Sequence, residues 1–135
     1  MNEKCVMIID DSLPLGELAN VAAILGITLG GKMPEAVGSD VRDGAGNSHM
    51  GVIKTPVPIL KASRETLGKL RLRLYEDEFK ALTTADFTEL AQSCKTYDEF
   101  IDKMSYAQTL DYVGLALVGD KRLVNRLTGS LPLLK

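Results

Sequence analysis

The sequence has few of the residues that usually carry metal or redox chemistry. It contains two cysteines, one histidine and no tryptophan. Cys5 and Cys94 form no C-x-x-C pair, and a single histidine cannot complete a zinc site of the usual spacing. The glycine-rich segment near residue 30 follows a helix and matches neither a dinucleotide-binding motif nor a P-loop. We therefore expect no metal site and no cofactor.

Long apolar runs and an excess of positive charge are also absent. No apolar run approaches the roughly 20 residues that a membrane span needs, and the N-terminus lacks the layout of a signal peptide. Lys and Arg number 16 against 18 Asp and Glu, which gives a net charge of -2, and the sequence pI is about 5.4. Nucleic-acid-binding domains usually have a pI above about 9. These features predict a cytoplasmic protein that binds no membrane and is unlike a nucleic-acid-binding domain.

The composition that remains is typical of one globular domain. The chain has 135 residues, of which 45% are hydrophobic and 25% charged, enough for one core without disulfides or metals. No repeat or linker divides it, so we expect a single domain over residues 1–135.

Apolar patterning predicts strands that alternate with helices. The strands are expected at 4–9, 57–62, 79–83 and 113–118, with a short last strand after Gly129. The helices are expected from Ser12 to Gly30-Gly31, at 63–75, 87–95 and 97–107, and around 123–127, with Gly129 left-handed at the end of the last. Helices and strands in this order predict an α/β fold whose mostly parallel or mixed sheet is covered on both faces.

A glycine-rich turn between two short polar-apolar segments predicts a hairpin. Residues 41–43 and 49–54 flank Gly44-Ala45-Gly46-Asn47, a turn composition typical of hairpins. His49 follows this turn and could act as a general base, since its ordinary pKa lies near neutrality. The alternative, which we favour, is a strand residue that faces solvent.

Polar residues cluster after two predicted strands and in the first predicted helix. Ligands of open α/β sheets gather beyond the carboxyl ends of strands, so these residues could form a pocket for a small polar molecule, neutral or cationic because carboxylates line it. Alternatively, Ser12, Thr84 and Asp86 are helix caps and Asp10-Asp11 is a solvated turn. Separately, capping-box patterns pair Asp86 with Glu89 at the third helix and Thr96 with Glu99 at the fourth. We expect Asn20 to be partly buried and bonded to the loop 10–12. The ligand-binding candidates are Asp10, Asp11, Ser12, Asn20 and Thr83, and the weak catalytic candidates are Asp86, Thr84 and His49.

Both ends of the chain carry motifs of a known superfamily. The segment Leu115–Leu134 ends in a strand, glycine turn, helix and T-G-x-L, and the N-terminal strand leads through Leu13-Pro14-Leu15-Gly16 into a helix with Ala22-Ala23. In these features the chain resembles type II peptidyl-tRNA hydrolases. It resembles more closely an uncharacterised bacterial family, a domain of unknown function of the same superfamily. The motifs shared with that family are Asn20, Pro34-Glu35, Gly38, Asp43–Asn47 and Pro56.

The resemblance implies a three-layer α/β/α sandwich with a mixed central sheet, but it does not carry the enzyme's activity to this chain. The lysine of the hydrolases, in the first turns of the first helix, is replaced here by Glu17, which would repel the phosphates of tRNA. We therefore expect a protein that binds, or acts on, a small polar molecule. The alternatives are a peptidyl-tRNA or aminoacyl-ester hydrolase that uses Asp86 or Thr84, and a homodimeric interaction protein. The sequence leaves open whether the chain is an enzyme.

Overall fold

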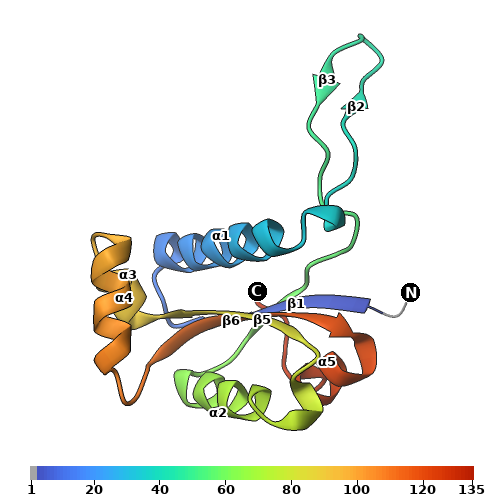
Figure 1. The fold of residues 1–135 in the computed structure, drawn as a ribbon. Helices are drawn as coiled ribbons and strands as arrows, with labels where there is room; N and C mark the ends of the chain where they lie inside the picture. The colour runs from blue at the N-terminus through green and yellow to red at the C-terminus, as the bar shows by residue number, and fades with distance from the viewer. Residues whose placement is uncertain (1–2) are drawn as a thin grey trace.

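The structure, a computed structural model, describes residues 3–135 and shows one mixed sheet between two layers of helices (Figure 1). The helix α1 covers one face of the sheet, and α2 and α5 cover the other. The short helices α3 and α4 lie at the end of the sheet where α1 begins. The sheet consists of β1 (Glu3–Ile9), β4 (Ile59–Lys61), β5 (Thr83–Thr88) and β6 (Tyr112–Asp120). The α-helices are α1 (Leu15–Lys32), α2 (Arg64–Leu74), α3 (Glu89–Ser93), α4 (Tyr97–Tyr106) and α5 (Lys121–Thr128).

The strand order is β4-β1-β6-β5. β1 is parallel to β4, whereas β6 is antiparallel to both β1 and β5. The two central strands are buried on both faces over Cys5–Ile9 and Val113–Val118, which explains their unbroken apolar runs. The predicted α/β fold with a mixed sheet covered on both faces is therefore confirmed.

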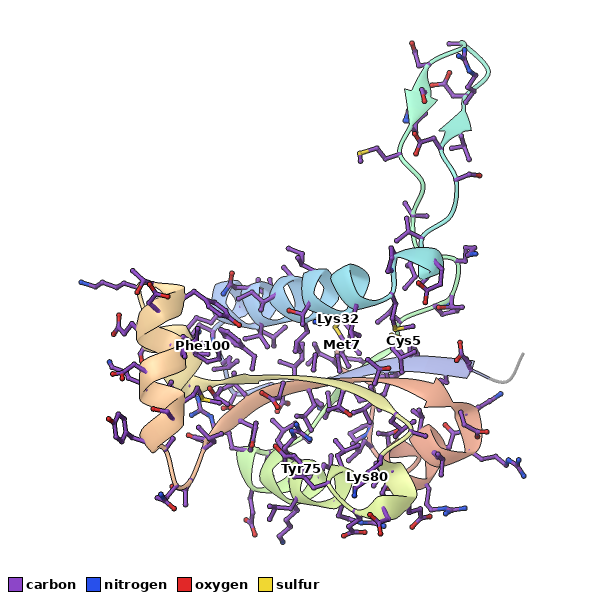
Figure 2. All side chains as sticks on the ribbon, in the orientation of Figure 1. Cys5, Met7, Lys32, Tyr75, Lys80 and Phe100 are labelled. Atoms are coloured by element: carbon purple, nitrogen blue, oxygen red, sulfur yellow. The ribbon has the colours of Figure 1, made fainter. Side chains whose placement is uncertain are left out.

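Alternation along β1 distributes its side chains between two cores. Cys5, Met7 and Ile9 belong to the core under α1, while Val6 and Ile8 belong to the core under α2 and α5. Figure 2 shows Cys5 and Met7 on the side of β1 that faces α1. Since side chains of a strand alternate between faces, this short strand anchors both helix layers.

The helix α1 packs very closely on β6 at Gly114. A Cβ atom at this position would lie 2.7 Å from Cγ1 of Val21 and 3.0 Å from Cδ1 of Leu25. Both side chains are buried in the core. The glycine is thus required by the close approach of helix and strand.

One predicted strand is displaced along the chain. Residues 79–83 were expected to form a strand, but the strand is β5, Thr83–Thr88, and a 3-10 turn occupies Asp77–Phe79. Phe79 is part of that turn and its side chain is buried in the core, so an apolar residue at this position does not indicate a strand. The polar residues of β5 obscured its pattern, because one of its faces pairs with charged groups of α2.

Several helix ends also differ from the prediction. The helix α1 continues through Gly30-Gly31 to Lys32 and starts after Pro14 without a side-chain cap, so Ser12 does not cap it. The cap of α3 is Thr88, not Asp86, whereas the predicted cap Thr96 is confirmed. Gly129 has φ -61° and is not left-handed. The expected last strand is reduced to one bridge between Leu60 and Leu133.

The predicted hairpin is confirmed and projects from the body of the molecule (Figure 1). Its strands β2 (Val41–Arg42) and β3 (Ser48–His49) are antiparallel. A 3-10 turn at Pro34–Ala36 leads from α1 into it. We name residues 37–54 the arm.

We expect Gly114→Ala to destabilise the protein by about 1–3 kcal/mol, because the added methyl group overpacks the contact between α1 and β6. The control is Gly16→Ala, since a Cβ at Gly16 meets no atom within 4 Å and alanine favours a helix. Urea unfolding of the two variants measures the difference. Equal stabilities would show that α1 does not need the glycine.

Candidate functional site

Asp10 is the centre of a hydrogen-bonded cluster at the carboxyl end of β1. Its side chain is buried; Oδ1 accepts hydrogen bonds from the backbone N–H of Ser12 (2.9 Å) and from Ser12 Oγ (2.7 Å). Its Oδ2 accepts a bond from Arg64 Nε at 2.8 Å. Asp11 lies beside it and faces Lys61, with 3.7 Å between Oδ2 and Nζ. Asp10, Asp11 and Ser12 thus lie together at this edge of the sheet.

Arg64, the first residue of α2, binds two further carboxylates at this edge. Its Nη1 donates to Oε2 of Glu89 at 2.5 Å and to Oδ2 of Asp111 at 2.7 Å. Hydrogen bonds from Arg64 to Asp10 above all, and then to Asp111 and Glu89, raise the pKa of the guanidinium above its ordinary value. One cation thus connects the ends of β1 and β5 with the starts of α2 and β6.

Opposing effects act on the pKa of Asp10. Burial raises it, but the hydrogen bonds from Arg64 and Ser12 outweigh burial and hold the pKa below its ordinary value of 3.8. The carboxylate is therefore ionised at neutral pH and fully engaged by its own neighbours.

The other predicted residues of the rim lie elsewhere in the sheet. Thr83 pairs with Val118, which pairs with Cys5 near the amino end of β1, so Thr83 and Thr84 lie toward the opposite edge from Asp10. The sequence predicts them at the carboxyl end of a strand because the predicted strand, 79–83, starts four residues before β5. Asp86 lies within β5 and accepts a bond from Arg71 Nε at 2.8 Å.

Asn20 and His49 are both exposed. The prediction that Asn20 is partly buried against the loop 10–12 is wrong, because it lies on the outer face of α1. His49 lies in the arm, where its Nε2 is 2.8 Å from Oδ2 of Asp43. It is a solvent-facing strand residue, as favoured from the sequence, and it belongs to β3, which projects away from the sheet (Figure 1).

A cavity of about 550 Å³ lies near the amino end of β1. Its walls come from β1, from the last turns of α1 and from the segments that flank the arm. Most of its surface is apolar, and side chains that line it include Cys5, Met7, Leu29, Met33, Ile53 and Val57. Burial raises the pKa of the Cys5 thiol, so this side chain is uncharged at neutral pH. We name this cavity the α1 pocket.

Two glycines of α1 leave space for the α1 pocket. Gly26 and Gly30 are four residues apart and both line it, since residues i and i+4 share one helix face. A Cβ at Gly30 would meet no atom within 4 Å. This spacing was the sequence signal for the pocket, but the expected end of the helix at Gly30-Gly31 concealed it.

Charged residues surround the apolar lining of the α1 pocket. Glu3, Glu35 and Lys54 contribute to its wall, and none of the three forms an ion pair with another residue of the described chain. Both signs of charge are therefore available to a bound molecule, in contrast to the cluster around Arg64.

A second cavity, of about 460 Å³, lies between α1, β5 and the short helices α3 and α4. Phe87, Tyr97 and Phe100 line it together with Thr28 and Lys95. Within residues 3–135, no group of histidine, cysteine and acidic side chains could hold a metal ion. In the same range no helix combines the length and apolarity that crossing a membrane demands.

We expect Arg64→Met to destabilise the protein by about 2 kcal/mol at neutral pH. This is below the 3–5 kcal/mol typical of a broken buried pair, because Arg64 is about one-third exposed. Asp10, whose folded pKa is lowered, favours the folded state above its unfolded pKa and loses that contribution as the pH falls through the folded value. The deficit of the variant should therefore shrink in acid, which urea unfolding at several pH values measures. Lys69→Met, at an exposed pair, is the control; a pH-independent deficit would contradict this role of Asp10.

Comparison with known proteins identifies the family. Residues 3–135 match the family described as "Protein of unknown function (DUF2000)", and no curated protein matches the chain. The fold is similar to the solved structure of the protein of unknown function Atu0240 from Agrobacterium tumefaciens strain C58. The TM-score is 0.90 at 26% identity, over 100% of this chain and 99% of that chain. Because the family match extends over almost the whole sequence, this chain belongs to the DUF2000 family of proteins of unknown function.

Proposed function

We propose that the protein binds a small, mainly apolar molecule in the α1 pocket. The observation that carries this proposal is the cavity itself, about 550 Å³ in volume and lined mostly by apolar side chains. Sites for small molecules typically measure about 300–1,000 Å³ and combine an apolar lining with a few polar groups. The α1 pocket has both properties.

The lining indicates the chemistry of the ligand. Met7, Leu29 and Met33 offer flexible or branched apolar contacts, and methionine adapts to irregular shapes. Burial of apolar ligand surface contributes about 25 cal/mol per Å². Glu35 and Lys54 provide charges of both signs, so we propose an apolar body that carries a polar end group.

The rim around Asp10 has less support as the binding site. Asp10 is bonded to Ser12 and Arg64, and Nη1 of Arg64 donates to Glu89 and Asp111. A polar ligand at this rim would have to replace bonds that the protein already makes with itself, at a cost of about 0.5–1.5 kcal/mol or more for each bond. The α1 pocket requires no such exchange.

The layered fold supports our placement of the chain in the type II peptidyl-tRNA hydrolase-like superfamily, but the hydrolase activity is less well supported. Thr84 and Asp86 lie apart from the cluster at Asp10, and Asp86 is engaged by Arg71. Glu17 is exposed in the first turn of α1, where the hydrolases have their lysine. Binding is therefore the function that we propose.

We expect no useful cleavage of peptidyl-tRNA, since the acidic Glu17 replaces the cation that would contact phosphate. The assay follows the release of free tRNA from a labelled peptidyl-tRNA, with an authentic hydrolase as the positive control. Robust turnover that Asp86→Ala abolishes would establish the hydrolase alternative.

The α1 pocket is tested by two substitutions at neighbouring glycines. Gly30 lines the pocket, whereas Gly31 is exposed and does not, and a Cβ at either residue meets no atom within 4 Å. Leucine at either position replaces a helical glycine and should preserve folding. We expect Gly30→Leu to weaken binding by about tenfold or more, equivalent to at least about 1.4 kcal/mol, and Gly31→Leu to bind like the wild type.

The probe for this test is the neutral apolar dye N-phenyl-1-naphthylamine, whose fluorescence rises in an apolar site. Titration of the wild type should give a saturable increase, and thermal unfolding should show that both variants are folded. If the wild type does not bind any apolar probe, or if the two leucine variants bind equally, the proposed function is wrong.

A further inference from the structure

We propose that the arm is a dimerisation element that packs against the arm of a second copy of this chain. The proposal concerns residues 37–54 and does not depend on a ligand in the α1 pocket. It develops the homodimer alternative that the sequence left open, and it rests on three properties of the arm: a well-defined conformation, exposed apolar side chains and unpaired backbone edges.

The tip of the arm is held by the side chain of Asp43. Its Oδ1 accepts hydrogen bonds from the backbone N–H groups of Ala45 (2.9 Å) and Asn47 (3.0 Å). Its Oδ2 lies 2.8 Å from Nε2 of His49. The hydrogen bonds to Asp43, above all that of His49, lower the pKa of this carboxyl group, so it is ionised at neutral pH. The turn at the tip is thus stabilised by side-chain hydrogen bonds.

The base of the arm is closed by contacts between its two segments. The backbone N–H of Gly38 donates to the carbonyl oxygen of Val52 at 2.8 Å, and that of Lys54 to the carbonyl oxygen of Ala36 at 2.9 Å. Gly51 lies so close to Gly38 that a Cβ atom would be 1.8 Å from the carbonyl oxygen of Gly38. Only glycine fits there, and the close contact fixes the direction of the arm.

Apolar side chains on this arm are exposed. Met50 is 85% exposed and Val52 77% exposed. The two residues are two positions apart in an extended segment, so they lie on the same face. A two-stranded hairpin alone is at best marginally stable in water. An arm that is ordered and yet presents apolar groups to water is therefore suited to a partner surface.

The arm itself is the partner surface that fits best. Its strands β2 and β3 pair over two residues each, so most backbone groups along its outer edges have no strand neighbour, and such edges readily pair with another strand. Asp40 and Arg42 add charges of both signs, which a two-fold axis can bring together across an antiparallel contact. Closed two-fold dimers are the commonest oligomers.

The size of the arm is also consistent with this partner. A standard interface involves about 20–30 residues on each side, and the arm with its flanking turn comprises residues 34–54, which is at the lower end of that range. The match to the Agrobacterium protein covers 100% of this chain, the arm included. The aligned region of the two proteins, which are 26% identical, therefore includes the arm.

Sedimentation equilibrium and light scattering of the full chain test the proposal. We expect a mass twice that of the 14.6 kDa chain. The double variant Met50→Asp with Val52→Asp places like charges on the contact and should be monomeric. The control is Leu72→Asp, at a residue of α2 that is 71% exposed; it should remain dimeric. Circular dichroism and thermal unfolding confirm that each variant is folded.

Hydrogen exchange of the wild type gives a second measurement that needs no variant. Backbone amides at residues 49–53 should exchange more slowly at high than at low protein concentration, while amides of β6 should not change. A monomeric wild type overturns the proposal, as does a dimer that the arm variant leaves intact or that Leu72→Asp disrupts equally. A monomer whose arm binds a different protein also overturns it.

Discussion

The ion cluster around Arg64 determines which edge of the sheet is available for binding. The guanidinium of Arg64 bonds to Asp10, Glu89 and Asp111, and the four residues come from four separate parts of the chain. The cluster joins α2 and α3 to the sheet where the strands β1, β4 and β5 end. Carboxyl ends of strands are the usual ligand sites of such sheets, but here the polar groups satisfy one another.

The opposite edge of the sheet carries an apolar cavity in place of an ion cluster. Near the amino end of β1, the glycines Gly26 and Gly30 leave α1 without side chains toward the sheet, and the segments at the base of the arm complete an apolar cavity. Nearer the start of the same helix, at Val21 and Leu25, Gly114 of β6 allows α1 to approach the sheet very closely. The helix therefore packs tightly in one half and leaves space in the other, so that a rigid contact supports an open pocket.

Local patterns predicted the fold well but could predict the site only in part. The central strands, the hairpin and the cap Thr96 follow from apolar runs, turn residues and a capping pattern. The error in β5 moved Thr83 and Thr84 to the wrong edge, since its polar face is compensated by Arg71 from a distant helix. Arg64 and the α1 pocket depend on contacts between segments far apart in the sequence, such as Arg64 with Asp111, which periodicity does not encode.

The central claim, that binding occurs in the α1 pocket and not at the cluster around Arg64, is tested most directly by chemical-shift mapping. Proton–nitrogen spectra of the labelled protein would be recorded during titration with a library of small apolar and polar compounds. The account predicts that apolar compounds shift the amide signals of Gly26, Gly30 and Ile53, which line the pocket. Shifts confined to Ser12 and Arg64, produced by polar compounds alone, would contradict it.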